Sequence, residues 1–342
     1  MKKVVLLVLC ILISGCDGHF LEDKNKEYKN KFIEKGFNEE EVLLFNDFND
    51  ETKDLILNNP NKTLDLINIK STFDEDYLID YLNSNYDINT FIYVKEHVSD
   101  SLRNRFNMFY KDDFFILNNT DLYFKYYKDF VDTRSLIEYV NTKAYKIPYE
   151  EYEKSDTSKG IYMIASKRYY LDNYEPDDLV KVEKGYYVFN VSEMKKEAFN
   201  AFKDMADAAR LDNIYFYISS GYRSYDLQEK IYSNYLKKDT KENVDSYSSR
   251  SGFSDHQIGL SCDIRTKDIN FDNFKDSKES NWLINNAYKY GFILRYPEGK
   301  DDITGYMYES WHYRYVGLEA SYVIHETGIT FDEYYAYYVE NN

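Results

Sequence analysis

The sequence predicts an α+β protein in which a mostly helical N-terminal region precedes a domain of short strands and helices. Two patterns carry this prediction. Between residues 31 and 155, apolar residues recur at helical spacing behind acidic runs, as in EEEVLLF at 39–45. Between residues 160 and 330, runs such as IYFYIS at 214–219 alternate like strands between helical patterns. Hydrophobic residues make up 43% of the 342, so the chain can bury a core and is not globally disordered.

The first 16 residues have the pattern of a secretion signal. Two lysines precede an apolar run over 4–13, which is too short for a comfortable membrane span. The ending ISGC at 13–16 resembles a bacterial lipobox, which implies acylation of Cys16 and anchoring to the outer face of the cytoplasmic membrane. The alternative is an ordinary signal peptide with a chance cysteine. The polar residues 17–30 are expected to form a tether.

Residues 31–155 form an acidic region with several short helical patterns. Each pattern opens with Asn or Asp followed by acidic residues, which favour a helix N-terminus. The segments 32–45 and 67–82 are weakly alike, which leaves a diverged helical repeat open. His97 stands alone here and is expected to be structural or exposed. The region is a spacer or a partner-binding module of unknown partner, and the polar run 150–160 is the expected linker to the next domain.

The domain over 160–330 is expected to contain strands and helices in mixed order. A strand at 185–191 is expected to lead into a helix at 191–211, capped by Ser192 and buried along one face. Ser224 is the expected cap of a helix at 225–238. The other expected elements are strands at 214–219, 260–265, 292–296 and 312–316, helices at 282–291 and 317–328, and an aromatic tail at 331–342.

Charge and cysteine content limit the possible partners and compartments. The formal net charge of −17 argues against nucleic acid, because phosphate binding needs clustered Lys and Arg. Cys10 and Cys16 fall in the leader, so Cys262 is left alone and no internal disulfide is expected in the mature chain. Cys262 is expected to be a small core residue.

The stretch from Ser254 to His312 contains a candidate metal site. His256, Asp263 and His312 offer imidazole nitrogen and carboxylate oxygen, which are donors that zinc accepts. Glu309 precedes the last of them by three residues and could take a proton from water beside the metal. A turn at Gly259 would let the first two residues converge. The pattern is not the HExxH helix of the best-known zinc proteases.

Four strings in this order give a specific resemblance. They are SGYRSYDLQEKIY (220–232), SRSGFSDHQIGLSCDI (249–264), WLINNAYKYGFILRYPEGKDDITGY (282–306) and ESWHYRYVG (309–317). They resemble the VanY-type D-alanyl-D-alanine carboxypeptidases, zinc peptidases of the bacterial cell wall that share a fold with lysostaphin-type enzymes and the hedgehog signalling domain. The resemblance covers about half the chain and implies a small antiparallel sheet, flanked by helices, that holds one zinc ion.

The resemblance also implies a role for each site residue. Zinc would be held by His256, Asp263 and His312, with Glu309 as general base and Arg223 as the group that binds the substrate carboxylate. Further candidates for substrate contact are Gln228, Ser254 and Trp311. The sequence departs from the family's usual residues at Ser251 and Ser310, where Pro is usual, at Asp255, often Glu, and at Ser261, usually Ala. None of these four is an implied ligand or the base.

The expected activity is removal of the terminal D-Ala from peptidoglycan stem peptides by a membrane-anchored zinc carboxypeptidase. An L,D-carboxypeptidase or an endopeptidase of peptidoglycan would use the same ligands. A non-catalytic lipoprotein that binds the cell wall is the alternative from another class. Residues 192–195 fit the SxxK pattern of serine enzymes, but no KTG follows, so we interpret this match as coincidence.

Overall fold

The computed structural model describes residues 17–70, 73–268 and 270–340. The predicted signal peptide and its lipidation site, Cys16, lie outside these residues. The chain divides into two compact units after Asn107, and each is described by itself. Within the described residues, no helix combines the length and the apolar character that crossing a membrane requires.

The first unit is helical. Its helices are α1 (Asp17–Glu34), α2 (Glu39–Leu43), α3 (Asp50–Asn58), α4 (Pro60–Ile69), α5 (Glu75–Asn83), α6 (Ile88–His97) and the start of α7 (Asp100–Tyr110). The side chains of Asn38, Asn49, Asp74 and Asp87 accept hydrogen bonds from first-turn N–H groups, which confirms the predicted Asn and Asp starts. The predicted tether at 17–30 is wrong, because these residues belong to α1 and Tyr28 is buried in the core of this unit.

The second unit starts well before the predicted linker at 150–160. It includes α8 (Thr120–Tyr126), α9 (Thr133–Asn141), the 3-10 turns η1 (Leu117–Asn119) and η2 (Tyr127–Asp129), and the strand β1 (Glu153–Lys154). Strand β1 pairs in parallel with β2 (Tyr169–Tyr170), and Lys143 forms an ion pair with Glu340 near the end of the chain. The predicted boundary was wrong because such long-range contacts do not change the local composition.

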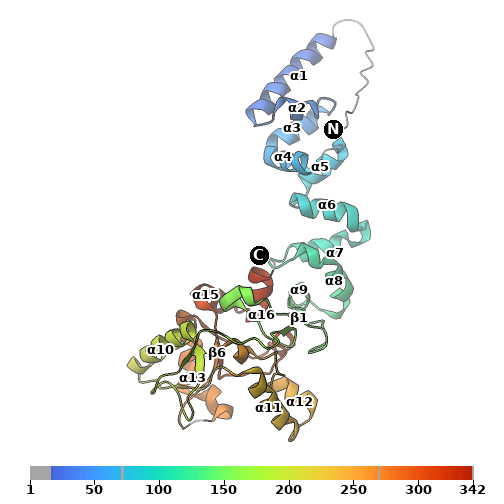
Figure 1. The fold of residues 1–342 in the computed structure, drawn as a ribbon. Helices are drawn as coiled ribbons and strands as arrows, with labels where there is room; N and C mark the ends of the chain where they lie inside the picture. The colour runs from blue at the N-terminus through green and yellow to red at the C-terminus, as the bar shows by residue number, and fades with distance from the viewer. Residues whose placement is uncertain (1–16, 71–72, 269, 341–342) are drawn as a thin grey trace. The chain divides into compact units, whose positions relative to one another are not determined.

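A four-stranded antiparallel sheet lies at the centre of the second unit (Figure 1). Its order is β5 (Tyr217–Ser220), β6 (Ser261–Arg265), β8 (His312–Tyr315) and β7 (Phe292–Leu294). Phe202 of α10 (Lys196–Leu211) packs on Phe216 and Phe292 with ring centroids 5.9 and 6.3 Å apart. The helices α11 (Tyr225–Leu236), α12 (Lys241–Tyr247), α13 (Lys278–Asn286), α14 (Asp301–Thr304) and α15 (Gly317–Thr327) complete the α+β class that the sequence predicts.

Two predicted elements differ from the structure. The expected strand at 185–191 contributes only a bridge from Tyr187 to Ile218, because positive φ angles at Gly185 (99°) and Phe189 (70°) interrupt an extended chain. Residues 193–195, expected in a helix capped by Ser192, form β4 (Glu193–Lys195), which pairs with β3 (Leu179–Lys181). Helix α10 therefore begins at Lys196.

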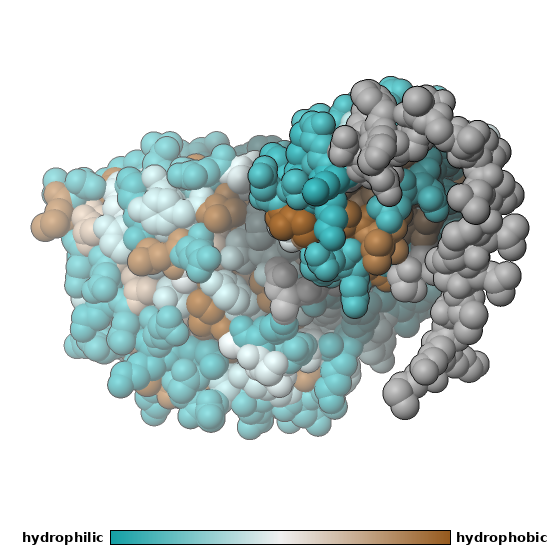
Figure 2. All heavy atoms as spheres, turned by 90° about the horizontal axis from the view of Figure 1, so that it is seen from above, coloured by the Kyte–Doolittle hydropathy of each residue, from teal (hydrophilic) through white to brown (hydrophobic). Residues whose placement is uncertain are grey.

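The expected aromatic tail at 331–342 is also different, because its described part is packed in the core. It forms α16 (Phe331–Tyr334) and a π-helical turn (Tyr335–Val339). Phe331 is fully buried beside Tyr334 and Val339. Figure 2 shows one face of the molecule, where groups of hydrophobic residues lie among hydrophilic ones.

Candidate metal centre

Two neighbouring strands and one turn carry the three predicted ligands. Asp263 of β6 and His312 of β8 are direct partners in the register of the sheet. His256 lies on the 3-10 turn η4 (Asp255–Ile258), which ends at Gly259. The φ of 81° at Gly259 turns the chain from η4 into β6, as the sequence predicted. The fold thus places the three side chains together without a shared helix.

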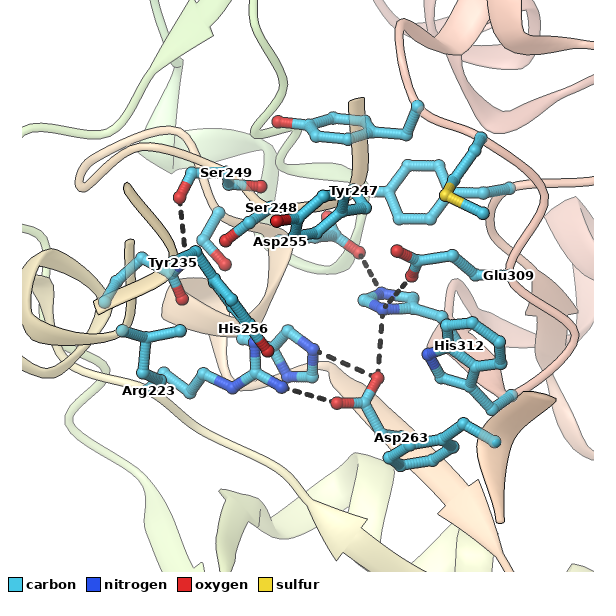
Figure 3. Close-up of a pocket in the computed structure, with 18 residues that line it drawn as sticks. Arg223, Tyr235, Tyr247, Ser248, Ser249, Asp255, His256, Asp263, Glu309 and His312 are labelled. Atoms are coloured by element: carbon cyan, nitrogen blue, oxygen red, sulfur yellow. Dashed lines mark hydrogen bonds and ion pairs between the residues drawn. The ribbon is translucent and has the colours of Figure 1, made fainter. Parts of the chain in front are cut away.

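The three donor atoms converge on one point. Asp263 Oδ1 lies 3.3 Å from His256 Nε2 and 3.3 Å from His312 Nδ1. All three side chains are buried, and their donor atoms lie within 4.8 Å of one another. Figure 3 shows both imidazoles directed at the same carboxylate. Within the described residues, this is the group of His, Cys, Asp and Glu whose geometry suits a metal ion.

The hydrogen bond of His256 fits a metal ligand. His256 Nδ1 lies 2.7 Å from the carbonyl oxygen of Gly221, which leaves Nε2 as the ring atom that faces Asp263. A carbonyl that accepts from the ring nitrogen not facing the metal is typical of metal-binding histidines. Two nitrogens and one carboxylate oxygen are a donor set that leaves a fourth tetrahedral position open on zinc. The residues present therefore fit a divalent ion such as zinc.

Burial and neighbouring charges shift the pKa values of His256 and Asp263. Burial lowers the pKa of His256, and the guanidinium of Arg223 lowers it further. Burial alone would raise the pKa of Asp263, but His256 and Arg223 hold it well below its usual range. The carboxylate is thus in the ionised form that a cation requires.

Glu309 lies beside the three ligands but outside the set. Its Oε2 is 3.4 Å from His312 Nδ1, and its side chain faces the same pocket. Its backbone N–H donates to the carbonyl of Tyr296 at 3.1 Å, which fixes the turn that leads into β8. Burial raises the pKa of the Glu309 carboxyl. This is the arrangement expected of a proton acceptor next to a metal.

Arg223 contacts a ligand in this structure. Its Nη2 donates to Asp263 Oδ2 at 2.5 Å, and its Nε donates to Ser220 Oγ at 3.0 Å. The sequence predicted a substrate carboxylate as its partner. The structure places Arg223 at the wall of the pocket, where it orients Asp263 and still faces the cavity (Figure 3).

Comparisons with known proteins place this centre in a family. Residues 191–318 match the VanY family, described as D-alanyl-D-alanine carboxypeptidase. The YodJ protein of Bacillus subtilis is 38% identical over 197 residues, which cover 54% of this chain and 70% of YodJ. The chain belongs to the VanY family. All the site residues predicted from the sequence other than Cys16 lie within the VanY match.

Two further similarities concern the same half of the chain. A D-alanyl-D-alanine carboxypeptidase of Enterococcus faecium is 34% identical over 201 residues, or 55% of this chain and 63% of that enzyme. The structure of the LdcB LD-carboxypeptidase is 37% identical and superimposes with a TM-score of 0.51 over 56% of this chain and 92% of that one. The part of the chain that includes the match at 191–318, called the VanY domain below, is therefore a carboxypeptidase domain.

The pocket of the VanY domain has a volume of about 490 Å³ and opens over the metal ligands. Gln228, Ser254 and Trp311, the further predicted contacts, all line it. Gln228 donates from Nε2 to the carbonyl of Ser249 at 2.7 Å, while its buried Oε1 has no hydrogen-bond partner. An acceptor in this position suits an N–H group of a ligand.

Several pocket residues were not predicted from the sequence. Ile231 and Tyr235 follow Gln228 along α11, and Tyr247, Tyr306 and Met307 are among the other residues of the wall. The spacing of the three α11 residues, three and then four, places them on one helix face. Once Gln228 was a candidate for substrate contact, that spacing could have indicated Ile231 and Tyr235 as well. Tyr247, Tyr306 and Met307 had no comparable signal in the sequence.

The remaining histidine and cysteine of this domain are not part of the candidate ligand set. His325 stacks on Tyr288 with ring centroids 3.6 Å apart, consistent with the predicted structural role. Cys262 is fully buried in the core, which confirms its prediction as a core residue, and burial raises the pKa of its thiol well above the usual value.

Proposed function

We propose that this protein is a zinc carboxypeptidase that removes the terminal D-Ala from peptidoglycan stem peptides. The observation that carries the proposal is the geometry of His256 Nε2, Asp263 Oδ1 and His312 Nδ1 around one point, with the carboxylate of Glu309 beside it. When bound there, zinc would supply Lewis-acid chemistry, which polarises a carbonyl and lowers the pKa of water toward about 7. The family supports the choice of substrate.

The chain's own residues divide the reaction between them. Hydrolysis breaks the C–N bond of the last peptide bond. The oxygen and one hydrogen of water join the carbonyl carbon of that bond, and the second hydrogen goes to the departing amine. Glu309 takes the proton from the attacking water and passes it to the nitrogen of the leaving D-Ala. Because Glu309 stands outside the ligand set, its carboxylate keeps the lone pairs that this transfer requires.

Arg223 would bind the free carboxylate at the end of the substrate. A guanidinium has five N–H donors, and the hydrogen bonds to Asp263 and Ser220 engage Nη2 and Nε. The donors on Nη1 suit a carboxylate that lies in the pocket. The unpartnered Gln228 Oε1 would accept an N–H of the same peptide.

An L,D-carboxypeptidase is the second candidate. The similarity to the LdcB LD-carboxypeptidase favours it, and that activity would use the same ligands and base. The deciding experiment incubates the full-length protein with pentapeptide and tetrapeptide muropeptides, with and without a chelator. Loss of one alanine from the pentapeptide, restored by zinc after chelation, supports the D,D-activity. Loss from the tetrapeptide alone would replace it with the L,D-activity.

An endopeptidase of peptidoglycan and a non-catalytic cell-wall-binding lipoprotein remain as other outcomes. Cleavage of cross-linked muropeptides, with both linear peptides intact, would indicate the endopeptidase. Zinc binding with no cleavage of any of the three would indicate the binding protein. Glu309 argues against this outcome, because a purely structural site has no use for a carboxylate outside the ligand set.

We also propose that the protein is held at the outer face of the cell membrane by a lipid on Cys16. The support is the ISGC sequence at 13–16 behind a short apolar run. The wild-type protein is expected in the membrane fraction and to incorporate labelled palmitate. Cys16→Ser should abolish labelling. A membrane-free, unlabelled wild-type protein would exclude the anchor.

A further inference from the structure

A second layer of residues lies directly behind the metal ligands. It consists of Asp255, Ser261 and Arg314. Asp255 precedes His256 in η4, while Ser261 and Arg314 are cross-strand partners in β6 and β8. Each of these two lies two residues from the ligand of its own strand, so it shares that ligand's face. Every element that carries a ligand therefore also carries one member of this second layer.

The carboxylate of Asp255 joins the other two members. Arg314 Nη1 donates to Asp255 Oδ1 at 2.5 Å, and the hydroxyl of Ser261 donates to Asp255 Oδ2. Arg314 is fixed in turn, because its Nη2 donates to the carbonyls of Ile161 and Met163 at 3.0 and 2.6 Å. None of the three is more than 1% exposed. These contacts hold the three ligand-bearing elements together from behind.

The same carboxylate faces the outer nitrogen of one ligand. Asp255 Oδ2 lies 3.7 Å from His312 Nε2, the ion pair that a dashed line marks in Figure 3. Among the described residues, that buried nitrogen has no partner within hydrogen-bond distance. Metal-binding histidines donate their second ring N–H to a carboxylate or carbonyl, which fixes the tautomer and the ring orientation. His256 has such an acceptor in Gly221. Asp255 is the group placed to serve His312 in the same way.

We infer that Asp255, Ser261 and Arg314 are positioning residues for the metal site, and that the Ser261 hydroxyl holds Asp255 Oδ2 on the His312 side. The inference rests on the proposed zinc function. Aspartate has a short side chain, so without the hydroxyl its Oδ2 loses its hydrogen-bond donor and keeps, besides His312, only the longer ion pair with Arg295 Nε at 3.8 Å. A glutamate reaches one methylene further, and removal of the Ser261 oxygen makes room for it. The two positions therefore act as a pair.

The test is a double-mutant cycle on the full-length protein. The zinc dissociation constant is measured by competition with a chromophoric chelator for the wild type, Ser261→Ala, Asp255→Glu and the double variant. Each single change should weaken zinc binding by about 10-fold, at the low end of the effects of residues that hydrogen-bond metal ligands. The double variant should recover to within about threefold of the wild type, because the paired changes compensate.

Two controls separate positioning from stability. Ser321→Ala removes another buried hydroxyl. Ser321 lies in α15, and its hydroxyl donates to the carbonyl of Tyr288 and contacts no ligand. It should leave zinc affinity unchanged. Thermal unfolding of the metal-free proteins reports stability alone, and Ser261→Ala should not be more destabilised than Ser321→Ala.

Three outcomes would overturn the inference. Ser261→Ala could bind zinc as tightly as Ser321→Ala, the double variant could bind no better than the single ones, or the loss of affinity could follow the loss of metal-free stability across all variants. Zinc binding by the wild type without peptide cleavage would overturn the proposed function alone, because the affinities would still test the positioning. A wild type that binds no zinc would overturn both.

Discussion

The ring of Tyr337 stacks on the ring of Phe114, with centroids 4.1 Å apart and planes inclined by 12°. This contact joins the last turn of the described chain to the segment that precedes α8. Phe331 lies in the same C-terminal segment and is fully buried. The C-terminal aromatic residues thus belong to the core that supports the VanY domain.

Phe331→Ala should therefore destabilise the protein strongly. Removing a fully buried phenylalanine costs about 3 to 5 kcal/mol through lost burial and the cavity that remains. Tyr338→Ala is the matched control, because Tyr338 lies in the same segment with 43% of its surface exposed. It should cost less than about 1.5 kcal/mol. Urea denaturation measures both, and equal midpoints would show that this segment is not part of the core.

His312→Ala should abolish zinc binding, because it removes one of three converging donors and leaves a buried Asp263 with less compensation. His325→Ala provides the control, since His325 stacks on Tyr288 away from the site. Metal analysis after gel filtration should find about one zinc per chain in the control and the wild type. Equal zinc content in both variants would rule out the proposed ligand set.

Glu309→Gln should lower kcat by about 10² to 10⁴, the usual contribution of a general base. Zinc content should stay unchanged, since Glu309 lies outside the ligand set. Glu319→Gln changes an exposed carboxylate on α15 and should leave kcat as it is. Loss of zinc from Glu309→Gln would instead make Glu309 a ligand, and an unchanged kcat would remove it from the mechanism.

A pH dependence of stability should follow from Lys167. Burial lowers the pKa of Lys167 to about 8, with Arg168 and Arg250 acting in the same direction and Asp245 against them. Unfolded lysine keeps its proton up to a pH of about 10.4. Between these two pH values the unfolded state binds more protons than the folded state. The contribution of Lys167 to the free energy of unfolding therefore rises with pH.

Lys167→Met removes this titration. From pH 8 toward 10, the wild type should gain stability relative to Lys167→Met, by at most about 3 kcal/mol for the whole shift. The comparison stops there because exposed tyrosines then begin to ionise. Denaturant midpoints at several pH values measure the difference. Parallel pH profiles for the two proteins would show that Lys167 keeps an ordinary pKa in the fold.

The sequence indicated the metal site well because the ligands lie in short, distinctive strings. The residues that position these ligands could not be predicted from short strings. Arg314 reaches Asp255 across 59 positions, and no local pattern predicts such a contact. Two departures from the family pattern, Asp255 and Ser261, are neither implied ligands nor the base. In the structure they contact each other directly behind His312.

The limits of the fold prediction have the same origin. The α+β class and the helix starts follow from local preferences, and both are present. The missing strand at 185–191 has strand-like residues, but a positive φ at Phe189 is a tertiary feature that propensity does not report. The tail at 331–342 is rich in tyrosine, a residue that occurs both in cores and at surfaces. Its burial depends on partners such as Phe114, which are distant in sequence.

Arg223 provides a prediction that separates two roles. If it binds the substrate carboxylate, the wild type should cleave a pentapeptide with a free terminus far better than the same peptide with a C-terminal amide. Arg223→Ala should then raise KM for the free acid by about 10- to 100-fold and lose that preference, because a charge-assisted bidentate contact is gone. Arg223→Lys should recover only part, since lysine has no fork.

The contact with Asp263 predicts a different result. If Arg223 only orients that ligand, Arg223→Ala should weaken zinc binding while the preference for the free carboxylate persists at saturating zinc. Measuring KM for the acid and the amide, together with the zinc dissociation constant, distinguishes these roles. Arg210→Ala is the control, because Arg210 pairs with Asp207 on α10 outside the pocket and should change neither quantity. A variant of Arg223 with unaltered KM and zinc affinity would remove it from the site altogether.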